Sequence, residues 1–443
     1  MADALAKDLG RPAYEAVGAE IGATLTEVKL AIANLKYWMR PETVSTNLLL
    51  QPGSSWIQRE PKGVVLIVGP WNFPINLTLA PAVAAIAAGN CVVIKPSEVA
   101  SATEALVAKL VAQYLDPAAI RVMVGGVPET TALLALPWNH IFYTGNGMVA
   151  KIVMEAAAKH LTPVTLELGG KSPVIVDTGL SDSQLKVACK RIMHTAAYLN
   201  TGQICVAPDF ILVHADEEQR LLKMLTAVNK EFAAATEGTR RVVNSRHFDR
   251  LGRLLDGAGG SVICGGKPDP ETAAIPATIV SRPDMGAPIM SEEIFGPLLA
   301  VQPVPSIDAA IAELRDRETP LALYLFSNSQ ATIDNVLANT ASGGVCINDT
   351  LMHLGNPNLP FGGQGASGFG SYHGRWGFEE FSHKRSVLHR GLSFDLDRYP
   401  PYTPQKLELL KKVQRGELVP SGLKSAGIVL AAFALGALVK SRL

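Results

Sequence analysis

Apolar runs and helix-like stretches alternate along the first part of the chain. The apolar run Val64–Val68 breaks at Gly69-Pro70, and a helical stretch rich in small residues follows as far as Gly89-Asn90. A second apolar run, Cys91–Ile94, then stops at Lys95-Pro96. Short apolar runs bounded by Gly and Pro are typical of buried strands, so the pattern predicts a β-α-β unit.

The same alternation continues along the next hundred residues. It predicts a helix near 102–114, a strand near 141–143, a helix near 148–159 and strands near 164–168 and 174–176. Strands separated by helices indicate a parallel sheet that is covered by helices on both faces. A second α/β pattern begins after Cys205 with "DFILVHA", a long helix, "LALYLFS" and "GGVCIND", which predicts a separate lobe.

Composition narrows the classes of function. The 443 residues carry 40 Lys+Arg and 40 Asp+Glu, so no net charge attracts nucleic acid, and we assign no nucleic-acid partner. The five cysteines are odd in number and form no C-x-x-C pair, which predicts a reducing compartment, no disulfide framework and no metal site. The N-terminus lacks the apolar core of a secretory signal, so an intracellular location is expected.

One glycine-containing turn has the context of a dinucleotide-binding fingerprint. Gly145-x-Gly147-x-x-Ala150 follows an apolar strand and opens a helix, whose N-terminal amides can bind a pyrophosphate. A simple strand-to-helix turn that needs glycine explains this motif equally well. Glu167 lies about 20 positions further on, where an acidic residue binds ribose hydroxyls, but the flanking Leu166 and Leu168 also suit a desolvated general base.

Seven short motifs occur in the order and spacing of one enzyme superfamily. They are "PWNFP", "KPSE", "YTGN", "LELGGKSP", "GQIC", "EEIFGP" and "PFGGQGASGFGSYHG", and they cover roughly Pro61 to Arg385. This set resembles the aldehyde dehydrogenase superfamily. The local sequences "GQICVAPDF", "ALYLFS", "SYHG" and "FSHKRS" resemble those of the class 3 branch, which includes fatty aldehyde dehydrogenases.

The resemblance implies three catalytic residues. Cys205 would be the nucleophile, Asn72 would form the oxyanion hole with the Cys205 backbone N–H, and Glu167 would activate water, which moves it from ribose binding to catalysis. By local sequence alone Asn72 is a turn residue before a proline. The other four cysteines are expected to be inert small hydrophobic residues.

The resemblance also implies a cofactor site. NAD is the expected cofactor, with NADP as the alternative, because Glu98 would repel a 2′-phosphate that Lys95 would attract. Without the resemblance, Lys95 and Glu98 are a solvated turn with a surface ion pair. The expected cofactor-binding residues are Lys95, Glu98, Gly145, Asn146, Gly147, Gly169, Glu293 and Phe295.

Three features depart from the resemblance. Ile204 precedes the expected nucleophile where class 3 members often carry Thr, which would make the pocket more hydrophobic. Ala150 replaces a common third glycine of the fingerprint. The chain is also expected to begin later than its relatives do, without most of a first helix.

The predicted fold class is therefore α/β, with a Rossmann-like cofactor-binding domain and an α/β catalytic domain. The first is assigned to 1–170, with an oligomerisation hairpin near 41–62, and the second to 171–348. A bridging segment follows at 349–397, and 398–443 is assigned to a linker and a hydrophobic C-terminal tail. The proline-rich "RYPPYTPQ" marks the start of that linker.

The end of the chain is apolar. Ala426–Val439 contains 14 residues without a charge, about 21 Å as a helix, against a hydrocarbon core of about 30 Å. Flanking lysines can extend its reach, so membrane association is expected, with packing on the protein or a partner as the alternative. The final Ser441-Arg442-Leu443 resembles a peroxisomal signal. The expected location is therefore an intracellular membrane, that of the endoplasmic reticulum or the peroxisome, with the enzyme facing the cytosol.

The predicted function is NAD(P)-dependent oxidation of medium- and long-chain aliphatic aldehydes to carboxylic acids by a homodimer. The intermediates would be a thiohemiacetal and a thioester on Cys205. Two alternatives stay open: a biosynthetic dehydrogenase for an apocarotenoid or isoprenoid aldehyde, and a catalytically silent membrane-bound scaffold.

Overall fold

The structure is a computed structural model that describes residues 1–47, 50–236, 241–393 and 398–415. The expected apolar tail at Ala426–Val439 and the last three residues lie outside the described residues. Two compact units make up the chain: one combines Met1–Leu35 with Pro61–Ser382, and the other combines Lys36–Glu60 with the residues from His383 onward. Both α/β sheets belong to the first unit.

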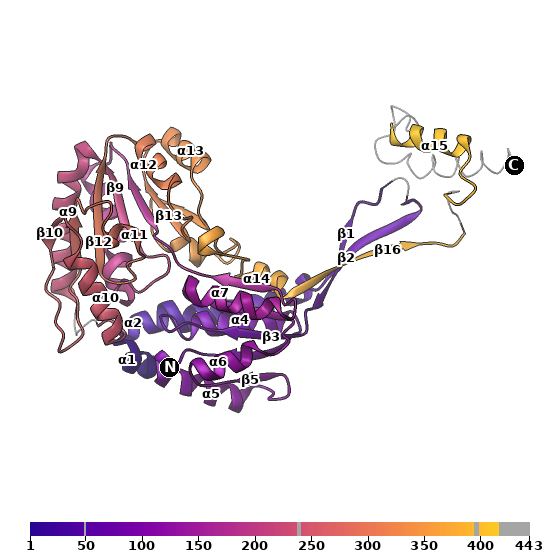
Figure 1. Ribbon diagram of the computed structural model, residues 1–443, viewed down its shortest axis with the longest axis horizontal. Helices are drawn as coiled ribbons and strands as arrows, with labels where there is room; N and C mark the ends of the chain where they lie inside the picture. The colour runs from indigo at the N-terminus through magenta and orange to yellow at the C-terminus, as the bar shows by residue number, and fades with distance from the viewer. Residues whose placement is uncertain (48–49, 237–240, 394–397, 416–443) are drawn as a thin grey trace. The chain divides into compact units, whose positions relative to one another are not determined.

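A six-stranded sheet forms the first half of that unit (Figure 1). The apolar runs become strands because their side chains are buried on both faces, as in Val65, Leu66 and Ile67, each 0% exposed. The strand order is β15-β7-β6-β3-β4-β5, and all neighbours are parallel except β15 on β7. The bounds are β3 (Val64–Val68), β4 (Cys91–Lys95), β5 (Ile120–Val122), β6 (His140–Thr144), β7 (Val164–Glu167) and β15 (Gly368–Phe369).

Helices connect these parallel strands. Chain order reverses at β3, since β4 and β5 lie on one side of it and β6 and β7 on the other, and ligands of open α/β sheets bind at such a switch point. The connections are α4 (Asn76–Ala87), α5 (Ser101–Tyr114), α6 (Val127–Leu134) and α7 (Gly147–Ala158). The N-terminal helices are α1 (Ala2–Leu9), α2 (Ala13–Glu15), a π-helical segment (Ala16–Gly22) and α3 (Ala23–Trp38).

A seven-stranded sheet forms the second half of the unit, in the order β10-β11-β12-β9-β8-β13-β14. Only β10 and β11 are antiparallel neighbours. The strands are β8 (Pro173–Val176), β9 (Phe210–His214), β10 (Ser261–Cys264), β11 (Thr278–Ser281), β12 (Leu298–Val304), β13 (Ala322–Phe326) and β14 (Gly344–Ile347). The helices are α8 (Asp182–Met193), α9 (Glu218–Ala235), α10 (Ser245–Asp256), α11 (Pro288–Ser291), α12 (Ile307–Arg315) and α13 (Gln330–Asn339). A later helix, α14 (Gly374–Glu380), packs against α4 of the first half.

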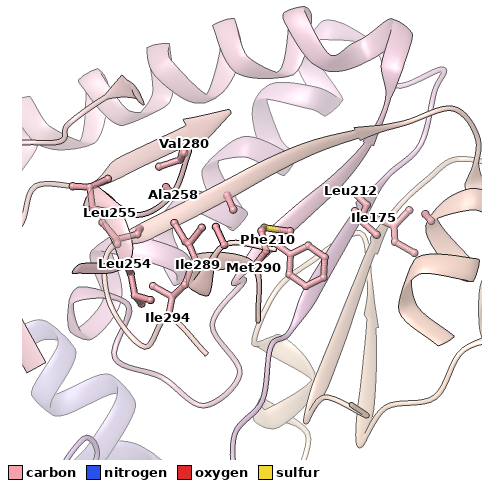
Figure 2. Packing of buried hydrophobic residues seen from close by; sticks show 14 of the residues in the cluster. Ile175, Phe210, Leu212, Leu254, Leu255, Ala258, Val280, Ile289, Met290 and Ile294 are labelled. Atoms are coloured by element: carbon pink, nitrogen blue, oxygen red, sulfur yellow. The ribbon is translucent and has the colours of Figure 1, made fainter. Parts of the chain in front are cut away.

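One face of this sheet packs against helices in a continuous apolar core. Figure 2 shows Leu212 of β9 and Val280 of β11 with Leu254 of α10 and Ile289 of α11. These side chains are almost fully buried, which makes the sheet a rigid support for the loops at its ends.

The second unit contains a three-stranded sheet in the order β1-β2-β16. Its elements are β1 (Glu42–Val44), β2 (Gly53–Pro61), β16 (Ser382–Arg390) and a helix, α15 (Pro404–Gln414). β1 and β2 pair antiparallel in the range where the sequence predicts an oligomerisation hairpin. Oligomerisation itself stays a prediction. Within the described ranges, no helix is both long enough and apolar enough to span a bilayer.

The predicted α/β fold class is confirmed, and most predicted elements form within a few residues of their expected bounds. The strand predicted near 141–143 is β6, and the helix predicted near 148–159 is α7. The expectation for the minor cysteines is wrong at one position: Cys91 is exposed, because it begins β4 at the edge of the apolar run.

Leu212→Ala tests how much the apolar core beside the seven-stranded sheet contributes to the stability of the protein. Leu212 is 0% exposed, so its truncation leaves a cavity and should lower the free energy of unfolding by about 2–5 kcal/mol. Urea denaturation monitored by circular dichroism measures the change. The matched control is Leu337→Ala on α13, where Leu337 is 47% exposed and the loss should stay below about 1 kcal/mol. Equal losses for both variants would contradict this account of the core.

Candidate active site

Glu167 is the last residue of β7 and is buried without a partner. It is 2% exposed, and neither carboxylate oxygen has a hydrogen-bond partner in the described part of the chain. Leu166 and Leu168 flank it and are also buried. Burial raises the pKa of Glu167 well above its ordinary value, and the negative charge of Glu380 raises it further. The expected desolvation of this carboxyl is therefore confirmed.

The turn that carries Cys205 follows a strained segment. Asn200, Thr201 and Gly202 have successive positive φ angles of 46°, 56° and 69°, and a β-branched residue such as Thr201 rarely adopts this conformation. A Cβ on Gly202 would lie 2.2 Å from the Ala196 carbonyl oxygen, so only glycine fits. This backbone turns the chain out of the helix and presents Cys205 in a turn before β9.

Cys205 is a free, partly exposed thiol. Burial of the sulfur raises its pKa above the ordinary value, and the nearby charges of Glu293 and Glu167 raise it further. The backbone N–H groups of Cys205 and Val206 act in the opposite direction because they interact favourably with a thiolate. The thiol and the Glu167 carboxyl therefore lie close enough to influence each other's charge.

Asn72 is tied directly to the Cys205 turn. Its Nδ2 donates to the Gln203 carbonyl over 3.1 Å, and Asn200 Nδ2 donates to the Asn72 and Gln203 carbonyls, both over 2.9 Å. The loop after β3 and the turn before β9 are thus joined by side-chain amides. Asn72 is buried in this network, so the interpretation as a simple turn residue is incomplete.

The N-terminal helices support the same network. Arg11 pairs with Glu20 in the protein interior and also donates to the Asn72 carbonyl. Glu20 accepts hydrogen bonds from the backbone N–H groups of Ile75 and Asn76, at the start of α4. A carboxylate at a helix N-terminus is favourable, so Glu20 fixes both the helix and the loop before it.

Glu293 lies on a loop between α11 and β12 whose backbone is held from several sides. Lys171 donates to the Glu292 carbonyl and pairs with Asp209, which accepts from the Ile294 N–H. Arg250 donates to the Glu293 carbonyl over 3.0 Å. Burial and the nearby charge of Asp209 raise the pKa of Glu293 to about 8.

Gly169 and Phe295 lie beside this loop. A Cβ on Gly169 would lie 2.2 Å from Glu293 Oε1, so the backbone after β7 and the Glu293 carboxyl are in close contact. The Phe295 ring packs edge-on against Trp71, with ring centroids 5.4 Å apart. A small pocket next to the Cys205 turn is lined by the apolar residues Ile204, Pro208 and Phe295 and by the carboxyl residues Asp209 and Glu293.

Lys95 and Glu98 lie at the carboxyl end of β4. Lys95 is 2% exposed, and its Nζ donates to the Pro96 carbonyl and, over 3.1 Å, to Glu98. The interpretation of this stretch as a solvated turn is therefore wrong for Lys95. Because β6 and β3 lie between β4 and β7, the pair is about 14 Å along the sheet edge from Glu167.

The glycine-containing turn lies between these two positions. The Gly145 N–H donates to the Glu167 carbonyl over 3.0 Å, and Asn146 caps α7 by accepting from the Val149 N–H. Nothing lies within 4 Å of a Cβ built on Gly147, so the helix N-terminus is open to a ligand. Glu167, the glycine-containing turn and the Lys95–Glu98 pair thus lie along one edge of the six-stranded sheet, whereas Cys205 and Glu293 come from loops that precede strands of the seven-stranded sheet.

The matching family model covers residues 1–387 and describes the aldehyde dehydrogenase family. The chain belongs to the aldehyde dehydrogenase family. It is 45% identical over 415 residues to aldehyde dehydrogenase family 3 member H1 of Arabidopsis thaliana, covering 92% of this chain and 85% of the relative. The resemblance to the class 3 branch is thereby confirmed, and this chain is an aldehyde dehydrogenase enzyme.

Solved structures agree with this assignment. The substrate-bound state of Staphylococcus aureus AldH matches with a TM-score of 0.89 at 41% identity, covering 93% of this chain and 90% of that one. An indole-3-acetaldehyde dehydrogenase of P. syringae in complex with NAD+ matches with a TM-score of 0.79 at 25% identity, covering 88% and 80%.

Several residues that hold the site loops of this aldehyde dehydrogenase lie within the recognised motifs but were not predicted as site residues. Gln203 and Asp209 lie in "GQICVAPD", and Lys171 lies in "LELGGKSP", so these motifs carried the signal. No motif marks Arg11, in the loop between α1 and α2, or Arg250, on α10, and both reach the site loops from segments distant in sequence.

The thiol reactivity of Cys205 tests the electrostatics of the site. Because burial and two nearby carboxyls raise its pKa, alkylation by iodoacetamide should show a midpoint above about pH 8.5 in the apoenzyme. Peptide mass spectrometry measures the rate at each pH, with the exposed Cys91 peptide as internal reference. Glu293→Gln should lower the Cys205 midpoint. A midpoint below the ordinary range of a free thiol would contradict this interpretation.

Proposed function

We propose that this aldehyde dehydrogenase oxidises medium- and long-chain aliphatic aldehydes with NAD, using Cys205, Asn72 and Glu167. Its membership of the family establishes aldehyde oxidation with NAD or NADP as the general activity. One observation carries the mechanism: a free thiol in a turn hydrogen-bonded to Asn72 lies near a buried carboxyl that has no hydrogen-bond partner among the described residues.

The first step is attack by the Cys205 thiolate on the aldehyde carbon. A carbon–sulfur bond forms and the carbonyl oxygen becomes an oxyanion. The Asn72 amide has a second N–H besides the one donated to Gln203, and this N–H and the Cys205 backbone N–H are suitable donors to that oxyanion. Arg11 and Asn200 hold the Asn72 backbone carbonyl, and the Gln203 carbonyl accepts from the Asn72 side-chain amide, so the amide is oriented by the protein itself.

The cofactor site fits a dinucleotide on structural grounds. The open helix N-terminus at Gly147 suits the pyrophosphate, and the Glu293 carboxyl, with one buried oxygen unpartnered, suits the nicotinamide ribose. Lys95 and Glu98 would hold the adenosine ribose, and Phe295 would pack near the nicotinamide. When bound, NAD accepts the hydride that the thiohemiacetal carbon loses.

The choice of NAD over NADP rests on Glu98. Its side chain is 46% exposed, whereas the ammonium of Lys95 is buried and already paired with it. A 2′-phosphate would meet the negative charge of Glu98 before it reached Lys95. This arrangement favours NAD.

Deacylation then needs a base. Water attacks the thioester carbon, the carbon–sulfur bond breaks, and the water proton passes to Glu167. A carboxylate in a desolvated position is a stronger base than one in water, which suits this role. Glu167 must be ionised to accept the proton, so acid formation should slow as the pH falls through its raised pKa.

The apolar substrate class is supported by the residues near the nucleophile. Ile204, which directly precedes the nucleophile, is apolar and almost fully buried, and Pro208 and Phe295 lie in the same small pocket as the carboxyl residues Asp209 and Glu293. The apolar C-terminal sequence at 426–439 supports association with an intracellular membrane, where long-chain aldehydes partition. We further propose that the protein is a homodimer that faces the cytosol at the membrane of the endoplasmic reticulum or the peroxisome.

The absorbance of NAD(P)H tests the proposed function. The purified full chain is mixed with hexadecanal or acetaldehyde, with NAD and NADP in parallel. We expect a higher kcat/KM for hexadecanal and for NAD, because the apolar Ile204 precedes the nucleophile and Glu98 repels a 2′-phosphate. Preference for acetaldehyde would contradict the substrate class, and preference for NADP would contradict the role of Glu98.

Glu167→Gln separates the two chemical steps. It removes the base but keeps the side-chain size, so steady-state acid formation should fall about 10²–10⁴-fold. The first turnover, seen as a stopped-flow burst of NADH, should keep its rate within a few fold because it precedes deacylation. Cys205→Ala is the companion variant and should lose the burst as well. An equal loss of burst and steady-state rate in Glu167→Gln would contradict the assigned role.

A further inference from the structure

Four polar side chains form a hydrogen-bonded chain behind the proposed base. Lys62 Nζ lies 3.2 Å from His140 Nδ1, and His140 Nε2 lies 2.8 Å from Thr165 Oγ1. Thr165 Oγ1 donates to Glu380 Oε1 over 2.6 Å. The chain joins β6, β7 and α14 through side chains that are mostly buried.

The direction of the hydrogen bonds follows from the single hydroxyl hydrogen of Thr165. Since that hydrogen is donated to Glu380, the hydroxyl oxygen must accept from His140 Nε2–H. His140 Nδ1 is then the acceptor for the ammonium of Lys62. Burial and Lys62 lower the pKa of His140 to about 3, so the imidazole stays neutral over the working pH range. Every donor in the chain points toward Glu380.

Thr165 brings Glu380 to the side of β7 that carries Glu167. Alternate residues of a strand face the same side, and Thr165 and Glu167 are two residues apart, about 7 Å between Cα atoms. Thr165 is fully buried, so the position of its hydroxyl is fixed. A second carboxylate is therefore anchored close to the proposed base, and its negative charge raises the pKa of Glu167.

Among the described residues, few other titratable groups interact electrostatically with Glu167 or Glu380. Cys205 and Tyr372 are influenced by the charge of Glu167, since each has a pKa that it helps to raise. On the other side, Glu380 faces Lys62 through the chain, and His140 Nε2 lies 4.0 Å from Glu380 Oε1. His140 is neutral, so Glu380 is the charged group in this chain that acts directly on Glu167.

We propose that Glu380, held by Thr165, is a positioning residue that sets the pH range over which Glu167 accepts a proton from water. The inference rests on the proposed function of Glu167 in deacylation. In that step the water oxygen bonds to the thioester carbon, the sulfur of Cys205 leaves, and the water proton moves to Glu167. The charge of Glu380 favours that proton transfer, because it stabilises the neutral form of Glu167 relative to the anion.

Glu380→Gln tests the inference. The amide oxygen can still accept from Thr165, but the negative charge is lost. The acid limb of the pH profile of steady-state acid formation should move to lower pH by about half a unit or more. The maximal rate should fall a few fold, since the base becomes weaker. The stopped-flow burst of NADH should keep its wild-type rate.

Glu379→Gln is the matched control. Glu379 is the neighbouring carboxylate on α14 and pairs with Arg375 over 2.7 Å. Its variant should keep the wild-type pH profile, so that a shift in Glu380→Gln reports position rather than net charge. An unshifted profile in Glu380→Gln, or equal shifts in both variants, would overturn the inference.

Substitution of Thr165 gives a second test that does not depend on the folding of Glu380→Gln. Thr165→Val removes the hydroxyl that holds Glu380, so the acid limb should shift toward lower pH, and Thr165→Ser should restore the wild-type profile. A wild-type profile in Thr165→Val would overturn the inference. The proposed function fails separately, if Glu167→Gln keeps the wild-type rate of acid formation.

Discussion

The site depends on a carboxyl group that the fold holds in its interior, where no described residue forms a hydrogen bond with it. Removing a carboxylate from water costs several kcal/mol, and most buried acids recover part of this through pairing. Glu167 has no such pairing in the described residues, so it is held by the strand that carries it and by the apolar residues on either side. The cost of burying the charge is what makes this carboxyl a strong base.

The other parts of the site are arranged around that position by rigid supports. The Asn72 loop, the strained turn before Cys205 and the Glu293 loop are each held by buried ion pairs or amide hydrogen bonds within the protein. The reacting groups are therefore placed before substrate or cofactor binds, which reduces the reorganisation that catalysis requires. Glu380 extends this arrangement, because a charge at the end of a hydrogen-bonded chain acts on the base without touching it.

The sequence was sufficient for the fold class and for most strands of the two parallel sheets. The run Val64–Val68 is apolar throughout because both faces of its strand are buried, and such a run is visible without a structure. The tie between Asn72 and Gln203 was not predictable, since the two residues are 131 positions apart and meet only in the folded chain. The burial of Lys95 was also missed, because local sequence does not show what covers a strand end.

In the proposed mechanism the acyl group is bound to Cys205 as a thioester, and Glu167 acts as the base for its hydrolysis. Glu167→Gln incubated with octanal and NAD, quenched in acid and digested, gives the most direct test by peptide mass spectrometry. The account predicts an octanoyl thioester on the Cys205 peptide that accumulates in the variant and not in the wild-type protein. An unmodified Cys205 peptide during NADH formation, or an octanoyl group on another cysteine, would contradict it.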